Sequence, residues 1–107
     1  MYIDNFSEAT SGTVTLCSPD QNIVNVVKNI IITNDNDTAA TFQVLLDDVP
    51  LISYTVDEHD SFEYSGLITV RHGQSLYVTS MDGNAISVYA TIVVMQDKAV
   101  SECTMFS

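Results

Sequence analysis

The side chains best suited to act as bases are few in this 107-residue chain. Its two histidines, His59 and His72, each stand in a segment rich in turn-forming residues. A catalytic serine or cysteine needs a base within hydrogen-bond reach and a third group that orients the base. The sequence also has no Gly-x-Ser-x-Gly motif, which would expose a serine on a sharp turn. We therefore expect no catalytic residues and no enzymatic activity.

Acidic residues are abundant and gather in turn-like segments. A glycosidase carboxylate pair must flank a cleft at about 5 to 10 Å, and the neighbours at 47–48 and 57–58 stand in turns of a short chain. The segments 34–38 and 57–60 supply the oxygen ligands that Ca²⁺ prefers, but neither has the glycine and glutamate positions of an EF-hand loop. Because the same residue types form turns, we expect turns without metal or cofactor, and keep a structural calcium as the alternative.

The two cysteines, Cys17 and Cys103, stand far apart in the sequence. With two scattered histidines, they do not have the spacing of a zinc site. The first residues lack the positive charge and the apolar core of a signal peptide, which predicts synthesis in a reducing cytoplasm. We expect two free thiols, with a late Cys17–Cys103 disulfide as the alternative.

The charge of the chain limits its partners. It has 14 Asp and Glu residues against three Lys and Arg, a formal net charge of -11. Nucleic acids and anionic lipids attract proteins chiefly through Lys and Arg, so we expect no nucleic-acid partner. No stretch reaches the roughly 18 apolar residues of a membrane-spanning helix, and we expect no membrane partner. The acidity is explained most simply by solubility.

The elements that must position these residues are β-strands. The hydrophobic period is two residues along most of the chain, most clearly at 86–94. Turn residues recur at short, even spacing, and Asp82-Gly83-Asn84 is the strongest hairpin signal. About seven or eight strands predict an all-β fold, a two-sheet antiparallel sandwich that is either Ig-like or jelly-roll-like. The other strands are expected at 13–17, 23–33, 41–46, 49–56, 61–64, 67–71 and 75–80.

The two ends differ from the centre of the chain. Residues 1–12 are polar with few large apolar side chains, and residues 96–107 are of mixed character. We therefore expect an N-terminal arm at 1–12, a β-sandwich domain at 13–95 and a C-terminal tail at 96–107. Such arms either fray or are captured by a partner chain.

Aromatic residues are the candidate contact residues. Tyr54, Tyr77 and Tyr89 are expected on the exposed faces of strands, and Phe106 stands in the C-terminal tail. A tyrosine has an apolar ring and a polar hydroxyl, which suits either a protein interface or stacking on a sugar. Packing on the second sheet or over a sheet edge remains an alternative for the tyrosines.

Several features follow one another in a recognisable order. After a loose N-terminal lead come a strand with Lys before an apolar run into Asn, an alternating strand, a strand-Gly-strand passage and a last alternating strand. These stand at 27–34, 42–46, 67–78 and 86–94. The order resembles that of short all-β virion proteins of tailed bacteriophages, over about residues 13–95. One departure is Gln74, where such proteins often have Asp after the glycine.

The resemblance implies a structural protein of a virion, assembled in the host cytoplasm. We expect first a capsid decoration or cement protein, a homo-oligomer (most simply a homotrimer) that binds the major capsid protein or other virion proteins and stabilises the outer shell. One alternative is a neck, tail or fibre-associated accessory protein. Another, from a different class, is a small carbohydrate-binding module that uses outward tyrosines.

Overall fold

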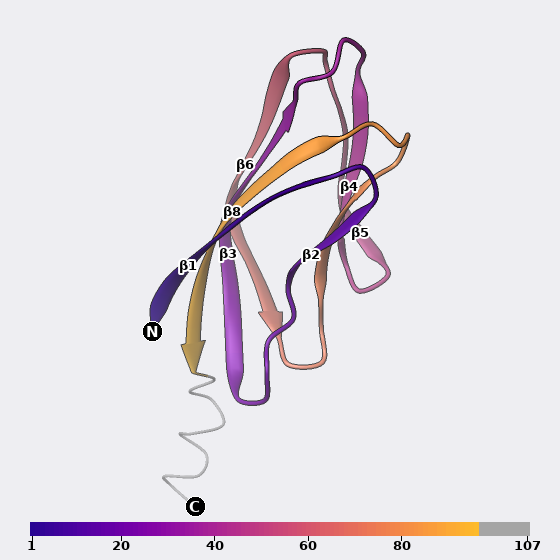
Figure 1. Cartoon of the computed structure of the whole chain (residues 1–107). Coiled ribbons are helices and arrows are strands. Elements are labelled where there is room, and N and C mark those ends of the chain that lie inside the picture. The colour runs from indigo at the N-terminus through magenta and orange to yellow at the C-terminus, as the bar shows by residue number, and fades with distance from the viewer. Residues whose placement is uncertain (97–107) are drawn as a thin grey trace, which may run out of the picture.

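The structure, a computed structural model, describes residues 1–96 and contains eight strands in two four-stranded antiparallel sheets (Figure 1). The large sheet has the order β1-β8-β3-β6, and the small sheet has the order β2-β7-β4-β5. No described residue is in a helix, so this part of the chain has no helix able to cross a membrane. The strands are β1 (Tyr2–Thr10), β2 (Thr13–Cys17), β3 (Ile23–Asn34), β4 (Ala40–Leu46), β5 (Val49–Val56), β6 (Asp60–Arg71), β7 (Leu76–Ser80) and β8 (Ile86–Gln96).

The strands pair in a nested order. β1 pairs with β8, β2 with β7, β3 with β6, and β4 with β5. This is the connectivity of a jelly roll, in which one long antiparallel hairpin wraps around the core. It is not that of an immunoglobulin domain, whose first two strands share a sheet. The predicted all-β sandwich is confirmed, and the strand order selects its jelly-roll form.

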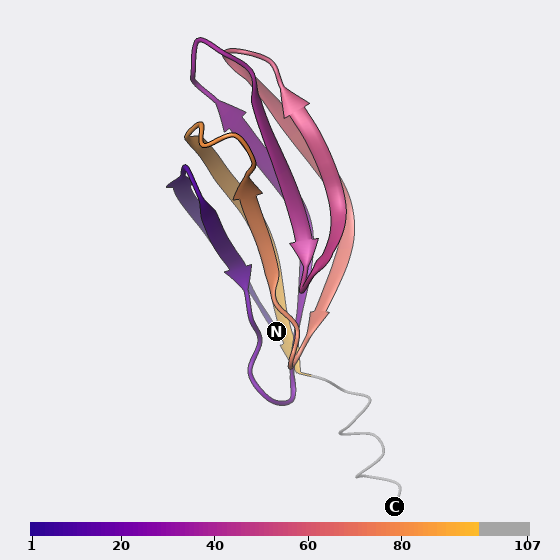
Figure 2. The ribbon, with the colours of Figure 1, turned by 90° about the vertical axis from the view of Figure 1, so that its right-hand side faces the viewer.

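The core lies between the two sheets, with the small sheet in front of the large one in Figure 2. The period of two turns every second side chain of each strand inward. On β8 the inward residues Ile86, Val88, Ala90 and Ile92 are all buried, as their alternation predicts. They meet inward residues of the small sheet, of which Phe42 is the largest fully buried side chain.

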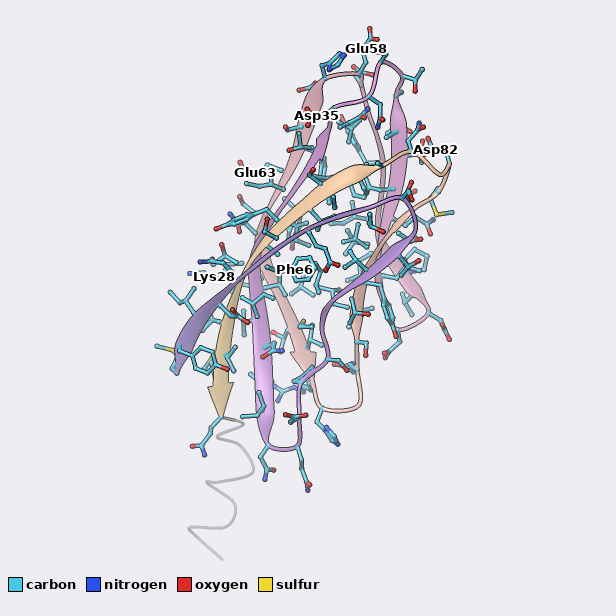
Figure 3. The ribbon with its side chains drawn as sticks, viewed as in Figure 1. Phe6, Lys28, Asp35, Glu58, Glu63 and Asp82 are labelled. Carbon is cyan, nitrogen blue, oxygen red and sulfur yellow. The ribbon has the colours of Figure 1, made fainter. Side chains whose placement is uncertain are left out.

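The N-terminal segment belongs to the sandwich. The sequence predicts a loose arm at residues 1–12, whereas β1 pairs with β8 from Tyr2 opposite Val94 to Thr10 opposite Ile86. Phe6 points from β1 into the space between the sheets (Figure 3) and packs against the core. An edge strand faces solvent on one face and along one edge, so it needs few apolar residues. The predicted tail lies outside the described residues from position 97 onward.

β6 is one strand where the sequence predicts two, at 61–64 and 67–71. The turn residues Ser65 and Gly66 lie at a β-bulge, where the register between β3 and β6 shifts. A Cβ atom on Gly66 would lie 2.6 Å from the hydroxyl oxygen of Tyr64. The glycine therefore permits a close approach of the Tyr64 side chain inside a strand, and does not end it.

Candidate binding surfaces

The histidines lie at opposite ends of the sandwich (Figure 1). His59, in the β5–β6 loop, has its Nε2 atom 2.8 Å from Oδ1 of Asp37, and both side chains are exposed. His72, in the β6–β7 loop, has its Nδ1 atom 3.2 Å from the carbonyl oxygen of Pro19. Each contact joins two neighbouring loops and brings no serine or cysteine nucleophile to the ring.

The segment 34–38, which the sequence offers as an alternative calcium site, forms a hydrogen-bond network between loops at one end of the sandwich. Asn34 is fully buried, and its Nδ2 atom donates to the carbonyl oxygens of Thr38, Val56 and Asp57 at 2.9 to 3.2 Å. Its amide therefore serves as a structural hydrogen-bonding centre. Among the described residues, no three His, Cys, Asp or Glu side chains are grouped so that they could hold a metal ion.

Tyr54 is 51% exposed, but it lies on the inner side of the edge strand β5 and not on the outer face that the sequence predicts. In the register of β4 with β5, Tyr54 lies opposite the buried Phe42, and both side chains point inward. The Tyr54 ring centroid is 4.8 Å from that of Phe62 and 6.5 Å from that of Phe42. The tyrosine therefore covers the side of the sandwich between the edge strands β5 and β6, which is the alternative that the sequence left open.

Tyr77 lies on the outer face of the small sheet, as expected, opposite Thr15 and Leu45. It lines a shallow hollow of about 310 Å³. Hydroxyl groups and carboxylates surround its ring there, which is the chemistry that a sugar would meet. The other lining residues are Thr13, Leu45, Asp47, Asp48 and Thr79.

Tyr89 lies on the outer face of the large sheet, also as expected, between Ser7 and Ile31. Its side chain is 38% exposed, and its hydroxyl donates to Oδ1 of Asn5 at 3.2 Å. The fourth candidate contact residue, Phe106, lies outside the described residues, as does Cys103.

The outer face of the large sheet is largely apolar, and we call it the large-sheet face. The strand register sets Ile3, Val93 and Val26 side by side across β1, β8 and β3. Met95 and Val24 form the next row, so the apolar side chains are contiguous across three strands. Leu67, on β6, is 67% exposed, and Ile3 is 65% exposed. The partly or fully exposed apolar members of the face are Ile3, Val26, Ile31, Leu67, Tyr89, Val93 and Met95, whereas Val24 is only 7% exposed.

Few charges interrupt the large-sheet face. Its charged residues in the described chain are Lys28, Glu63 and Arg71, which give it a formal charge of +1 on a chain of -11. Figure 3 shows Lys28 and Glu63 on the side of the large sheet that faces away from the small sheet. The other acidic residues of the described chain lie in loops, at strand ends or on the inner side of β1. The face thus carries little like-charge repulsion, as does the outer face of the small sheet, whose strands contain no charged residue.

A pocket opens at the end of the sandwich where the chain enters β1, and we call it the end pocket. The strands of the large sheet have 9 to 12 residues and those of the small sheet 5 to 8, so the large sheet extends past the small one. The β2–β3 loop covers this extension incompletely and leaves a cavity of about 390 Å³. It is lined by Tyr2, Asp4, Leu16, Cys17, Ser18, Pro19, Asp20, Ile23, Asn25, Ile92 and Val94.

Two buried polar side chains lie in the end pocket. Asn25 is 8% exposed, and its Oδ1 atom has no hydrogen-bond partner. Burial raises the pKa of the neighbouring Cys17 thiol, and the Asn25 side chain offsets part of this rise. Since a buried acceptor without a partner costs free energy, this oxygen marks a place where a donor is missing.

These features define a small jelly-roll domain with candidate binding surfaces on both sheets and at one end. No protein-family model matches the chain, and no curated protein matches it. Among solved structures it is similar to the globular domain of zebrafish complement 1qA protein, with 12% identity and a TM-score of 0.39. It is also similar to a chain of infectious bursal disease virus Gt strain, with 12% identity and a TM-score of 0.34.

The two solved structures are matched only in part. The match covers 75% of this chain and 66% of the complement domain, and 89% of this chain and 32% of the viral chain. The chain therefore spans about two thirds of the first and about one third of the second. At this identity and TM-score, the likeness carries no argument about function.

Proposed function

We propose that this chain is a non-enzymatic structural protein of a tailed-phage particle, which self-associates through the large-sheet face and decorates the outer shell of the capsid. The large-sheet face is the observation that carries the proposal. Contiguous exposed apolar area of this kind is uncommon on a monomer and is typical of interaction surfaces. The sequence resemblance to virion proteins of tailed bacteriophages is the reason for proposing a phage particle as the location.

The large-sheet face has the dimensions of a stable interface. The 12 residues of β3 extend over about 40 Å, and four strands at about 4.8 Å give a width of about 19 Å. The resulting area, roughly 750 Å², compares with about 800 Å² per partner in standard protein interfaces. Association through one such face per chain, around a rotation axis, closes without open-ended growth.

The charge distribution favours a second copy as the occupant of this face. A chain of net charge -11 repels its copies wherever acidic residues meet, and the large-sheet face is where they are sparse. Lys28 and Glu63 lie on the same face, so each can approach the opposite charge of a neighbouring copy. A trimer formed in this way matches the local threefold positions of a capsid, where contacts to the major capsid protein would hold the shell against internal pressure.

Sedimentation equilibrium of the purified chain tests the self-association. We expect the wild type to form a closed oligomer, most simply a trimer, and Leu67→Glu to be a monomer, because an unpaired carboxylate would be buried at the interface. Leu51→Glu is the matched control, since Leu51 is an exposed leucine of β5 in the small sheet. A monomeric wild type, or an equal loss of mass in both variants, would contradict association through this face.

Copy number in purified particles tests the location. Hundreds of copies on each particle support capsid decoration, whereas six or twelve would assign the protein to the neck or tail. Binding of the wild type, but not Leu67→Glu, to capsids stripped of the protein would show that decoration requires the oligomer.

The hollow at Tyr77 supports a second candidate function, a carbohydrate-binding module. A half-buried aromatic ring beside threonine hydroxyls and the carboxylates of Asp47 and Asp48 is suited to stacking on a sugar ring and accepting its hydroxyl hydrogens. A glycan array separates this function from self-association. Glycan binding that is lost in Tyr77→Ala and retained in Leu67→Glu would favour the carbohydrate-binding module. If no glycan on the array binds, only the structural role remains.

A further inference from the structure

The polar groups that line the end pocket are mostly hydrogen-bond acceptors, apart from the Tyr2 hydroxyl and the Cys17 thiol. Oδ1 of Asn25 is buried without a donor, and the carboxylates of Asp4 and Asp20 line the same cavity. Ser18 and Pro19 already have partners, because the Ser18 hydroxyl contacts Ser75 at 3.0 Å and the Pro19 carbonyl contacts His72. Among the described residues that line the cavity there is no lysine or arginine. These residues therefore offer negative charge and acceptors without a basic side chain to balance them.

We propose that the end pocket binds an alkyl-linked cation, that is, an ammonium or guanidinium group on a short apolar stem. The cationic head would donate to Asn25 Oδ1 and pair with the carboxylates of Asp4 and Asp20. A charged donor is the group that a buried acceptor binds best, and bonds to carboxylates add to it.

The walls of the pocket fit the stem of such a ligand. Leu16, Ile23, Ile92 and Val94 form its apolar lining, against which methylene groups would pack. Tyr2, at the mouth, contributes an aromatic ring whose face attracts cations. The cavity volume, about 390 Å³, is within the usual range of small-ligand pockets, roughly 300 to 1,000 Å³, so a stem of several carbons can enter.

A bare metal ion fits the pocket less well. The described residues contain no group of three His, Cys, Asp or Glu side chains that could hold a metal ion. Metal coordination would also leave the apolar walls without contact. An organic cation uses both the acceptors and the apolar lining.

This inference does not depend on the proposed assembly. Asp4 belongs to the inner side of β1, since it lies opposite Ile92, whereas Ile3 and the rest of the large-sheet face are on the outer side. A ligand in the end pocket and a second copy on the large-sheet face therefore approach opposite sides of the same sheet. Leu67→Glu should bind the cation as the wild type does.

The test is a titration of the ¹⁵N-labelled chain with agmatine, followed by nuclear magnetic resonance. We expect saturable shifts of the amide signals of Asp4, Asn25 and Ile92. Asp4→Asn should weaken the affinity about fivefold or more, because it removes one charged partner. Asp48→Asn, which changes the net charge equally but lies on the outer face of the small sheet, should change the affinity less than about twofold.

Three results would overturn the proposal. They are an absence of saturable shifts, an equal weakening by Asp4→Asn and Asp48→Asn, and equal binding of the neutral analogue butyramide. A variant of the buried Asn25 would test folding as well as binding, so Asp20→Asn is the second variant, and we expect it to weaken binding like Asp4→Asn. A parallel titration with an N-acetylated, C-amidated Gly-Arg-Gly peptide separates the two sources of the cation. Tighter binding of the peptide indicates an arginine side chain of a partner protein, and tighter binding of agmatine a free small cation.

Discussion

Oδ1 of the buried Asn34 accepts two hydrogen bonds from Asn36, one from its backbone N–H at 3.0 Å and one from its side-chain amide at 2.7 Å. The same Asn36 amide donates to the carbonyl oxygen of Ala85 at 2.7 Å. Because Asn34 also donates to the carbonyl oxygen of Asp57, the side chains of Asn34 and Asn36 together link three connections of the jelly roll: β3–β4, β5–β6 and β7–β8. A local turn motif thus joins segments that are distant in the sequence.

We expect Asn34→Ala to destabilise the fold by about 2 to 4 kcal/mol, because it leaves buried carbonyl groups without donors. Asn36→Ala, which retains the buried Asn34 amide, should cost less. The free energy of unfolding from guanidinium titration measures both. A loss below about 1 kcal/mol in Asn34→Ala would mean that water replaces the network.

β1 should contribute to stability through Phe6. We expect Phe6→Ala to cost about 1 to 3 kcal/mol, less than a fully buried Phe because this side chain is only partly buried. Ile3→Ala is the control on the same strand, since Ile3 lies on the outer side, and it should change the stability of the monomer by less than about 0.5 kcal/mol. If Phe6→Ala and the wild type had equal unfolding midpoints, β1 would instead be a loose arm, as the sequence predicts.

Most strands could be predicted from the sequence, whereas the two edge strands of the large sheet, β1 and β6, could not be predicted in full. β8 and β2 follow their expected ranges because alternating apolar residues fix which face is buried. β1 was missed because an edge strand anchored by Phe6 has no apolar period to detect. Gly66 suggested a turn because a bulge and a turn use the same residue, and only the position of Tyr64 distinguishes them.

The binding surfaces required the register of the strands. β3 carries apolar residues on both faces, and only the register shows that Val26 and Ile31 belong to the partly exposed large-sheet face. The end pocket depends on the unequal lengths of the sheets, which appear only once each strand is assigned to a sheet. Its one signal in the sequence was Asn25, a polar residue within the apolar run of β3.

Cys17 should be an inert thiol in the folded chain. Since burial raises its pKa, the Cys17 thiol stays protonated near neutral pH. Reagents that react with thiolates should therefore modify Cys17 only after unfolding. A Cys103→Ser background isolates this residue. Rapid modification of the native protein at pH 8 would contradict the burial, whereas failure of both wild-type cysteines to react after unfolding without reductant would indicate a disulfide.

The same thiol gives stability a dependence on alkaline pH. The folded pKa lies above the ordinary value of 9.0, so the folded state keeps its proton after the unfolded chain has lost it. The contribution is fully present below the unfolded pKa, and it is lost as pH rises toward the folded value. Cys17→Ala should flatten the decline of unfolding free energy above about pH 9, as measured by guanidinium titration.

Asp82 should show the opposite dependence, at acid pH. The backbone N–H of Thr41 donates to Oδ2 of Asp82 at 3.0 Å, which holds the pKa of this carboxyl below its ordinary value of 3.8. The stabilisation is present above the unfolded pKa and is lost as pH falls through the folded one. A carboxyl titration by nuclear magnetic resonance should give a midpoint for Asp82 below the ordinary value of 3.8. A midpoint at the ordinary value would contradict the bond.

Salt should strengthen the proposed self-association. Each chain has a net charge of -11, and the repulsion between copies is screened as the Debye length falls from about 10 Å at 0.1 M salt to about 3 Å at 1 M. We therefore expect the association constant from sedimentation to rise several-fold over this range, because apolar burial is not screened.

Two substitutions on the large-sheet face separate repulsion from desolvation. Lys28→Glu changes the formal charge of the face from +1 to -1, so it should weaken association at low salt and recover at high salt. Leu67→Glu should not recover, because salt does not supply the hydration that a buried carboxylate loses. If the wild type instead dissociates as salt rises, pairs such as Lys28 with Glu63 of a second copy, and not the apolar rows, hold the oligomer together.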